Sequence, residues 1–238
     1  MIPENLDYDA LKKRGFLRQK QEGLFLLRAR KRHGNYEAKD LEELVRVSRD
    51  FGRGFVHLTT RQGVEIPFIK FEDIDKVEAR IKAAGIETGT SGPRLRTTTT
   101  CPGNNWCKSG LMDTFSLYDR IENELNIKCA MDLPHKFKIS ISGCPNTCTR
   151  SQQSEIGVHG TAGGYSVYLG GCGGRTPRIG FKLNRTFSED EALKIIEAVV
   201  RFFKNNAKPK QRLALLIEEI GRDNFLKEVG LEKISVVQ

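Results

Sequence analysis

The chain has 238 residues, of which 38% are hydrophobic, and its formal net charge is +9. This length allows one or two small domains with a hydrophobic core. No run of about 18 apolar residues predicts a membrane helix, and residues 1–15 lack the apolar centre of a signal peptide. We therefore expect a cytoplasmic protein, in which the six cysteines indicate metal binding or catalysis rather than disulfides.

The positive charge suggests an anionic ligand. Nucleic acid is the usual candidate for a pI near 9.3. However, the sequence contains no helix-turn-helix, zinc-finger or RNA-binding signature, and only 8% of the residues are aromatic. Nucleic-acid binding is therefore not predicted, and small anions remain the better candidates.

The first third of the chain predicts a small α+β unit. Residues 1–22 are expected to form an arm or short helix that docks through Leu6, Leu11 and Phe16. The elements expected next are a strand, a helix, two strands and a helix, at residues 23–28, 38–51, 55–59, 64–69 and 71–84. This β-α-β-β-α order predicts a ferredoxin-like half-domain over residues 23–88.

A stretch rich in Gly, Ser, Thr and Pro, residues 86–96, predicts a domain boundary. The second domain, residues 89–238, is expected to be α/β and to end in helices. The expected elements are a helix at 110–125, strands near 137–142, 155–159, 166–169 and 179–183, and a helix after the capping box that begins at Ser188. Two further helices are expected to complete the chain.

Two cysteine motifs flank the strand expected at residues 137–142. The first motif is C-x5-C and the second is C-x3-C, and together they contain Cys101, Cys107, Cys144 and Cys148. Four thiolates suit a 4Fe-4S cluster, and the neighbouring Gly, Pro and Asn residues allow sharp turns that could aim the sulfur atoms at one point. Structural zinc is the alternative, although C-x5-C is wider than the usual zinc spacing. The remaining cysteines, Cys129 and Cys172, are expected to be buried as small apolar residues.

Residues 97–107 (TTTTCPGNNWC) and 142–160 (SGCPNTCTRSQQSEIGVHG) resemble the sirohaem and iron–sulfur signature of the sulfite and nitrite reductase family. The resemblance extends from about Gly23 to about Val229. It implies that the four motif cysteines hold a 4Fe-4S cluster and that Cys148 also ligates the iron of sirohaem. We expect Trp106 to pack over this cluster and exclude water.

The same resemblance implies roles for several basic residues. Four of them would act on the substrate anion, namely Arg30, Arg96, Lys136 and Lys138. Thr59 and Arg61 would contact the carboxylates of sirohaem. A register shift would replace Arg96 by Arg94. The alternative for Arg30 is a solvated loop, and the alternative for Lys136 and Lys138 is a solvated strand face.

The predicted function is that of a small assimilatory-type sulfite reductase, which reduces sulfite to sulfide with six electrons. No flavin or nicotinamide site is recognised, so the electrons are expected from an external donor such as a ferredoxin or a reductase subunit. Nitrite reduction to ammonia is one alternative, and a non-catalytic sirohaem or electron-transfer protein is another. Lys138 favours sulfite, because the nitrite enzymes often have Asn at the corresponding position.

Many members of this family carry two copies of the half-domain and its core, whereas one copy is recognised here. A homodimer, or a heterodimer with a close relative, would supply the second copy through an isologous interface. The alternative is a monomer in which residues 1–22 fold over the open face of the sirohaem.

Overall fold

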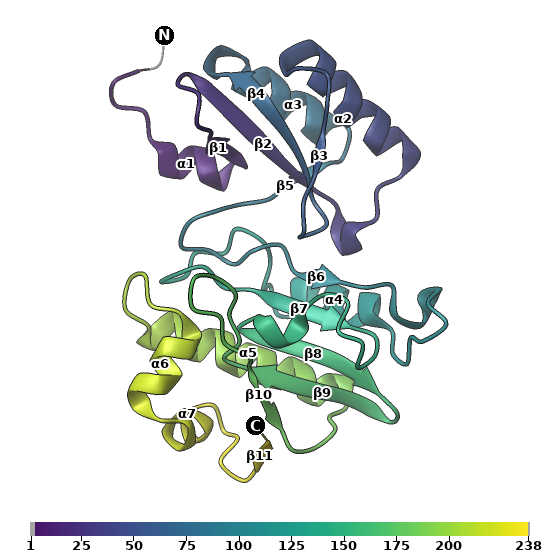
Figure 1. Cartoon of the computed structure of the whole chain (residues 1–238), viewed down its shortest axis with the longest axis vertical. Coiled ribbons are helices and arrows are strands. Elements are labelled where there is room, and N and C mark those ends of the chain that lie inside the picture. The colour runs from purple at the N-terminus through teal and green to yellow at the C-terminus, as the bar shows by residue number, and fades with distance from the viewer. Residues whose placement is uncertain (1–2, 238) are drawn as a thin grey trace. The chain divides into compact units, whose positions relative to one another are not determined.

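The computed structural model describes residues 3–237 and divides the chain into two compact units, one on each side of the Gly92–Pro93 bond. Figure 1 labels the α-helices and strands of both units. Within the described residues, no helix combines the length and apolar character needed to cross a membrane.

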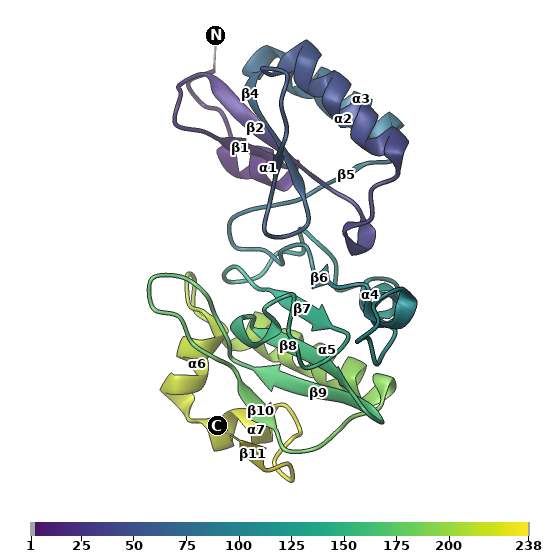
Figure 2. The same cartoon turned by 45° about the vertical axis from the view of Figure 1, so that its right-hand side comes forward.

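The first unit is an antiparallel sheet with helices on it. Its strands are β1 (Phe16–Arg18), β2 (Leu24–Arg30), β3 (His57–Leu58), β4 (Val64–Lys70) and β5 (Glu87–Thr88). Their order is β1-β2-β4-β3, and β5 pairs with β2. The helices are α1 (Tyr8–Lys13), η1 (Arg32–Gly34), α2 (Ala38–Phe51), η2 (Phe71–Asp73) and α3 (Ile74–Ala83). Figure 2 shows α2 and α3 side by side on one face of this sheet, and the predicted β-α-β-β-α order is confirmed.

Helix α2 occupies the predicted range, but its buried face differs from the expected one. Glu37 and Asp40 form a capping box at its start, and Gly52 follows its last residue. The sequence suggests Leu41, Leu44, Val45 and Ser48 for the inner face. Leu44 and Ser48 are buried as expected, but Leu41 is 42% exposed. The buried side chains at helical spacing are those of Asp40, Leu44, Val47 and Ser48. Asp40 can be buried because it caps the helix and pairs with Lys31.

Residues 3–22 are more closely integrated than an arm. Leu11 and Phe16 are buried in the core of the first unit, as expected. In addition, β1 pairs with β2 in antiparallel register, with Phe16 opposite Leu27. The segment therefore contributes a strand to the sheet as well as a docking helix.

The second unit contains a six-stranded mixed sheet in the order β11-β10-β9-β8-β7-β6. The strands are β6 (Thr99–Thr100), β7 (Ile139–Ser142), β8 (Ile156–Thr161), β9 (Gly164–Leu169), β10 (Phe181–Leu183) and β11 (Val236–Val237). Strands β6, β7 and β8 are parallel to one another, and the other pairs are antiparallel.

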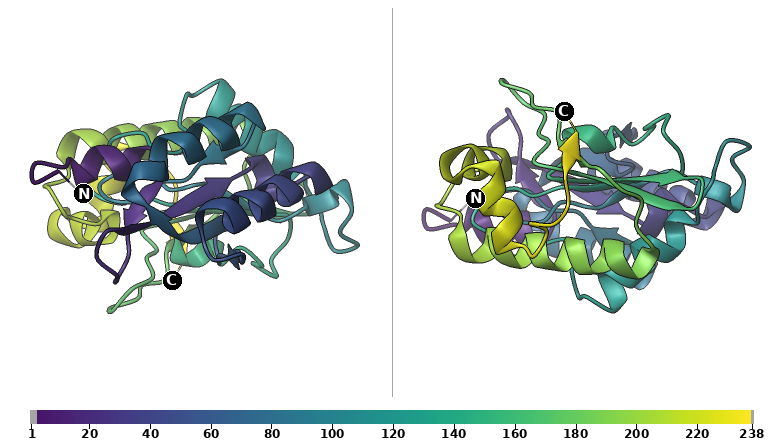
Figure 3. Two further views of the ribbon diagram at one scale, coloured as in Figure 1. Left: turned by 90° about the horizontal axis from the view of Figure 1, so that it is seen from above. Right: turned by 90° about the horizontal axis from the view of Figure 1, so that it is seen from below.

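The helices of this unit are η3 (Gly103–Asn105), α4 (Thr114–Asn123), η4 (Ser151–Gln153), α5 (Glu189–Asn206), α6 (Leu213–Ile220) and α7 (Arg222–Glu228). The predicted capping box is present, because Ser188 and Glu191 exchange side-chain and backbone hydrogen bonds at the start of α5. Figure 3 shows α5 lying along the sheet. Helix α4 begins at Thr114, later than expected, because Asp113 caps it.

The two faces of this sheet differ in character because side chains alternate along a strand. On β8, Ile156 and Val158 belong to the hydrophobic core that includes α4 and α5. Gly157 and His159 alternate with them and therefore lie on the opposite face. That face aligns Thr99, Ser140 and Ser142 from β6 and β7 with these β8 residues. Helix η4, which follows the second cysteine motif, packs against β8, and Ser154 directly after it hydrogen-bonds to Ser140 on this face.

Candidate iron–sulfur and anion-binding site

The two cysteine motifs leave the sheet from neighbouring parallel strands. Thr100 of β6 lies opposite Ile141 of β7, and the backbone amide of Cys101 donates to the carbonyl of Ile141 at 3.2 Å. Cys101 directly follows β6, and Cys144 follows β7 after one intervening residue. Since the carboxyl ends of parallel strands share one sheet edge, both motifs begin at the same edge.

Backbone hydrogen bonds connect the two motifs. The amide of Gly143 donates to the sulfur of Cys101 at 3.0 Å, and the carbonyl of Gly143 accepts from Leu111 at 2.8 Å. A Cβ atom at position 143 would lie 2.5 Å from the Cα of Gly103. Glycine at this position therefore permits a backbone approach that brings the sulfur and its donor together.

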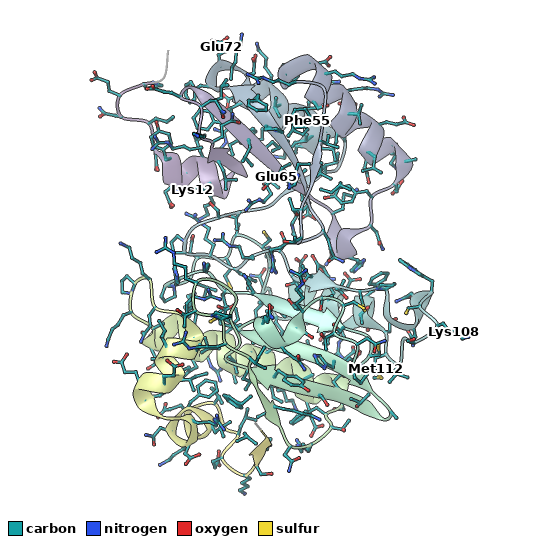
Figure 4. The ribbon with its side chains drawn as sticks, in the orientation of Figure 1. Lys12, Phe55, Glu65, Glu72, Lys108 and Met112 are labelled. Atoms are coloured by element: carbon teal, nitrogen blue, oxygen red, sulfur yellow. The ribbon has the colours of Figure 1, made fainter. Side chains whose placement is uncertain are left out.

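The C-x5-C loop is tied to helix α4. Gly103 has φ +55°, and a Cβ there would meet the carbonyl of Met112 at 2.4 Å, so this turn also requires glycine. Cys107 donates its amide to Gly103 at 3.1 Å. Asn105 donates its side-chain amide at 3.1 Å to the carboxylate of Asp113, which also caps α4. Figure 4 labels Met112 and Lys108 in this region.

Hydroxyl groups anchor the C-x3-C segment to the polar face of the sheet. The hydroxyls of Ser142 and Thr149 are hydrogen-bonded at 2.8 Å. A second, fully buried chain joins Thr99 to Ser140 at 2.8 Å and Ser140 to Ser154 at 2.7 Å. A satisfied buried polar network favours one conformation over alternatives, so these bonds define the path of the chain after Cys148.

The donor chemistry fits an iron–sulfur cluster. All four motif cysteines are free thiols; Cys144 is buried, Cys101 is half-buried, and Cys107 and Cys148 are exposed. The N–H···S bond to Cys101 suits a thiolate ligand, because hydrogen bonds to the sulfurs tune such clusters. Across residues 3–237, however, no three Cys, His, Asp or Glu side chains are close enough to hold a metal ion. The structure thus brings the motifs to one edge without converging all four sulfur atoms.

Trp106 lies at the surface of the C-x5-C loop, and its predicted packing over the cluster stays a prediction. Its side chain is 65% exposed, and its ring makes an edge contact with Phe115 at a centroid distance of 5.4 Å. The surrounding residues 104–109 are also all exposed.

Arg96, Lys136 and Lys138 lie on adjoining backbone segments. Leu95 forms a parallel bridge with Phe137, and the amide of Arg96 donates to the carbonyl of Phe137 at 2.9 Å. Phe137 is fully buried, whereas the two lysines that flank it are only half-buried. This alternation places both lysines on the side away from the core.

Arg94, the register alternative to Arg96, has a different environment. It is 3% exposed, and its Nε donates to Asp132 at 3.0 Å across an antiparallel bridge. Its guanidinium therefore joins two loop segments, and Arg96 is the arginine at this position that remains half-buried beside the lysines.

A further cation, Arg212, acts on Lys136 together with Arg96, and we call Arg96, Lys136, Lys138 and Arg212 the basic group. Burial lowers the pKa of Lys136, and the nearby charges of Arg212 and Arg96 lower it further. Burial also lowers the pKa of His135, with contributions from Lys136, Arg212 and Arg96. The sequence gives no sign of this role, because Arg212 simply ends a polar, basic stretch before α6.

The buried carboxylate of Glu155 is hydrogen-bonded to two members of the basic group. The side chain of Glu155 is fully buried and accepts the backbone amide of Lys138 at 2.9 Å. It also accepts the Nε of Arg212 at 2.5 Å. Burial raises the pKa of Glu155, and the charge of Arg212 opposes that shift. The basic group therefore includes one internal counter-charge.

The other predicted residues belong to the first unit. Arg30 is 5% exposed and forms an ion pair with Glu87, which lies opposite it on β5. The hydroxyl of Thr59 accepts from the amides of Gly63 at 3.1 Å and Arg61 at 3.3 Å. Thr59 thus stabilises the turn between β3 and β4, and the sirohaem contacts predicted for Thr59 and Arg61 stay predictions.

Comparison with known proteins identifies two family matches. Residues 91–236 match the nitrite and sulphite reductase 4Fe-4S domain, and residues 17–84 match the nitrite/sulfite reductase ferredoxin-like half domain. The predicted α+β fold class and its ferredoxin-like half-domain are confirmed.

The chain is 29% identical to a coenzyme F420-dependent sulfite reductase from Methanocaldococcus jannaschii, over 90% of this chain and 44% of that enzyme. It is 29% identical to an assimilatory-type sulfite reductase from Nitratidesulfovibrio vulgaris, over 76% of this chain and 81% of that protein. It is 26% identical to the large subunit of an NADH nitrite reductase from Escherichia coli, over 89% of this chain and 25% of that subunit. The chain thus spans less than half of the first and third of these relatives.

The solved structure of NirA from Mycobacterium tuberculosis superposes with a TM-score of 0.82 and 21% identity, over 96% of this chain and 47% of that one. Dissimilatory sulfite reductase I superposes with a TM-score of 0.79 and 17% identity, over 87% of this chain and 69% of that one. The fold is therefore shared with both proteins.

The cofactors of this family are sirohaem and a 4Fe-4S cluster, which confirms the cluster predicted from the cysteine motifs and the sirohaem implied by the resemblance. Because the 4Fe-4S domain match covers well over half of the sequence, the chain belongs to the nitrite and sulphite reductase family.

Proposed function

We propose that this oxidoreductase reduces sulfite to sulfide by six electrons, with Arg96, Lys136 and Lys138 binding the substrate anion. The observation that carries the proposal is the grouping of these cations on adjoining segments of the second unit. An anion that leaves water needs charged hydrogen-bond donors in exchange, and half-buried cations supply them.

The sulfite assignment depends on Lys138. The nitrite enzymes of the family often resemble Lys-aromatic-Asn here, whereas this chain has Lys136-Phe137-Lys138. A second ammonium favours a doubly charged oxyanion over a singly charged one. Since both sulfite and nitrite reductases are among the relatives, both substrates belong in the test.

The chain's own residues would bind the anion and deliver protons. Lys136, whose pKa is lowered by burial and by Arg212, is a stronger acid than an ordinary lysine and can protonate oxygens that leave as water. When bound, the cofactors supply an iron site for the substrate and a path for single electrons. Cys101, Cys107, Cys144 and Cys148 would hold the cluster, and Cys148 would also ligate the sirohaem iron.

We retain Arg30 as a further anion ligand, together with Thr59 and Arg61 as sirohaem contacts. Arg30 is paired with Glu87, so it can bind an anion only if that ion pair opens or is shared.

The electrons would come from an external donor, such as a ferredoxin or a reductase subunit. The proposed homodimer would be detected by sedimentation of the cofactor-loaded chain, as a species larger than 26.8 kDa.

The direct test measures sulfide and ammonia released by the cofactor-loaded chain with a reduced viologen donor. Lys138→Asn should weaken sulfite turnover by a few kcal/mol of transition-state binding, roughly 10- to 100-fold, while sirohaem content stays near normal. Lys233→Asn, at an exposed position, is the matched control. Unchanged sulfite kinetics together with lost nitrite kinetics would reverse the substrate assignment.

A further inference from the structure

Glu155 lies directly before β8, and its side chain is fully buried. A carboxylate in a protein interior requires compensating partners. Each carboxylate oxygen has a partner: one accepts the backbone amide of Lys138, and the other accepts the Nε of Arg212. Burial of an ion is tolerated only when it is paired and hydrogen-bonded, and here both conditions are met. The carboxylate therefore connects the strand segment of the lysines to a distant part of the chain.

Arg212 supplies the other half of this connection. It is the N-cap residue of α6, and its side chain is almost as deeply buried as that of Glu155. Its NH1 also reaches the carbonyl of Gly173 at 3.4 Å, within the glycine-rich loop of residues 170–174. One guanidinium thus links α6, this loop and Glu155.

The charges around Lys136 show why this link matters to the basic group. The groups that act on Lys136 are the cations Arg212 and Arg96 and the opposing groups Glu155 and Cys172, and His135 is its sequence neighbour. Without Glu155, Arg212 would add an uncompensated cation to a group that is already mutually repulsive. With it, Arg212 remains close enough to influence Lys136 while its charge is balanced.

We propose that Arg212 is a positioning residue for Lys136 and Lys138, acting through Glu155 and the Gly173 carbonyl. It holds the Glu155 carboxylate that accepts the Lys138 amide. It therefore fixes the position of the backbone segment from which the two lysine side chains extend. It also sets the local field in which Lys136 gains and loses its proton. The inference rests on the proposed anion-binding role of these lysines for its effect on turnover, but not for its structural and titration effects.

The test uses the full, cofactor-loaded chain and the variant Arg212→Met, which keeps much of the side-chain volume and removes the charge. We expect hydrogen exchange of the Lys138 amide to accelerate about tenfold or more, because its buried acceptor loses its partner. The pKa of Lys136, followed by NMR, should rise because a nearby cation is removed. The KM for sulfite should rise more than kcat falls.

The control is Arg178→Met. Arg178, in the segment between β9 and β10, makes an ion pair with Glu218 of α6, but that partner is exposed. This variant should leave Lys138 exchange and Lys136 titration unchanged. If Arg212→Met does not fold, Arg212→Lys replaces it, since it keeps the charge but cannot contact Glu155 and Gly173 in the same way. Faster Lys138 exchange in that variant supports the proposal.

Unchanged Lys138 exchange and unchanged Lys136 titration in a folded Arg212 variant would overturn the inference. These two measurements do not depend on substrate. If the wild-type chain reduces no sulfite but the variants change exchange and titration as expected, the positioning role stands and the proposed function fails. If sulfite is reduced and neither quantity changes, the function stands and the positioning role fails.

Discussion

The backbone amide of Gly143 donates a hydrogen bond to the sulfur of Cys101 across 3.0 Å. The bond connects the residue before the second cysteine motif to the first cysteine of the other motif. An N–H donor stabilises the negative charge of a thiolate, and hydrogen bonds to ligand sulfurs help to set the reduction potential of an iron–sulfur cluster. The close packing of Gly143 on Gly103 makes this contact possible.

Gly143→Ala should disrupt this junction. The added methyl group would lie 2.5 Å from the backbone of Gly103, so one motif must move away from the other. Such overpacking typically costs about 1–3 kcal/mol, and iron per chain should fall as well. Chemical unfolding and iron analysis measure both effects. Gly173→Ala is the control, because no heavy atom beyond its own chain neighbours lies within 4 Å of the added carbon. Equal losses in both variants would contradict this explanation.

Cys148→Ser should abolish the coupled sirohaem and cluster absorption and all reduction, because the proposed shared thiolate is removed. Cys129→Ser should leave both nearly intact, since Cys129 is half-buried and its sulfur contacts the Thr97 hydroxyl at 3.6 Å. Absorption spectra and acid-labile sulfide counts compare the two variants. A Cys148→Ser protein with a normal absorption spectrum and normal activity would contradict the role of Cys148 as the thiolate shared by the cluster and the sirohaem iron.

Asp113→Ala should weaken both helix α4 and the first cysteine loop. Its carboxylate caps the helix and accepts from Asn105, so we expect a loss of about 1 kcal/mol in unfolding free energy and reduced cluster retention. Asp7→Ala removes a comparable cap from α1 in the first unit. Both variants should lower stability, but only Asp113→Ala should accelerate iron loss to a chelator.

His159 should make stability fall under mildly acidic conditions. Burial lowers its pKa to about 4, its Nε2 has no hydrogen-bond partner among the described residues, and its ring packs on Tyr168 at 4.5 Å. An unfolded His titrates near 6.5, so between about pH 6.5 and 4 the unfolded chain binds more protons. The free energy of unfolding should therefore drop by up to roughly 3 kcal/mol as pH falls through this window.

The variant His159→Phe isolates this contribution, because it keeps an aromatic ring against Tyr168 and removes the titrating group. Urea unfolding at several pH values should show a shallower decline than in the wild type. His57→Phe, at an exposed position on β3, should keep the wild-type decline. Parallel profiles for wild type and His159→Phe would show that other groups cause the acid sensitivity.

Local signals in the sequence predicted the elements well. Helix α2 matches its predicted range because residues at helical spacing and a following glycine, Gly52, indicate the same segment. The capping box at Ser188 is equally local, and it marks the start of α5 correctly. The cysteine motifs identified the family and its cofactors, because their residue types and spacing are themselves the chemical signal.

Tertiary structure decided which side chains meet. The burial of Val47 instead of Leu41, the hydrogen bond between Thr99 and Ser140, and the pairing of Arg212 with Glu155 all depend on contacts between segments far apart in sequence. Composition and periodicity do not encode such contacts, because a charged residue looks the same in solvent and in a buried ion pair. Residue types thus determined the chemistry available to this protein, whereas strand pairing determined that Cys101 meets Gly143 and that Lys138 meets Glu155.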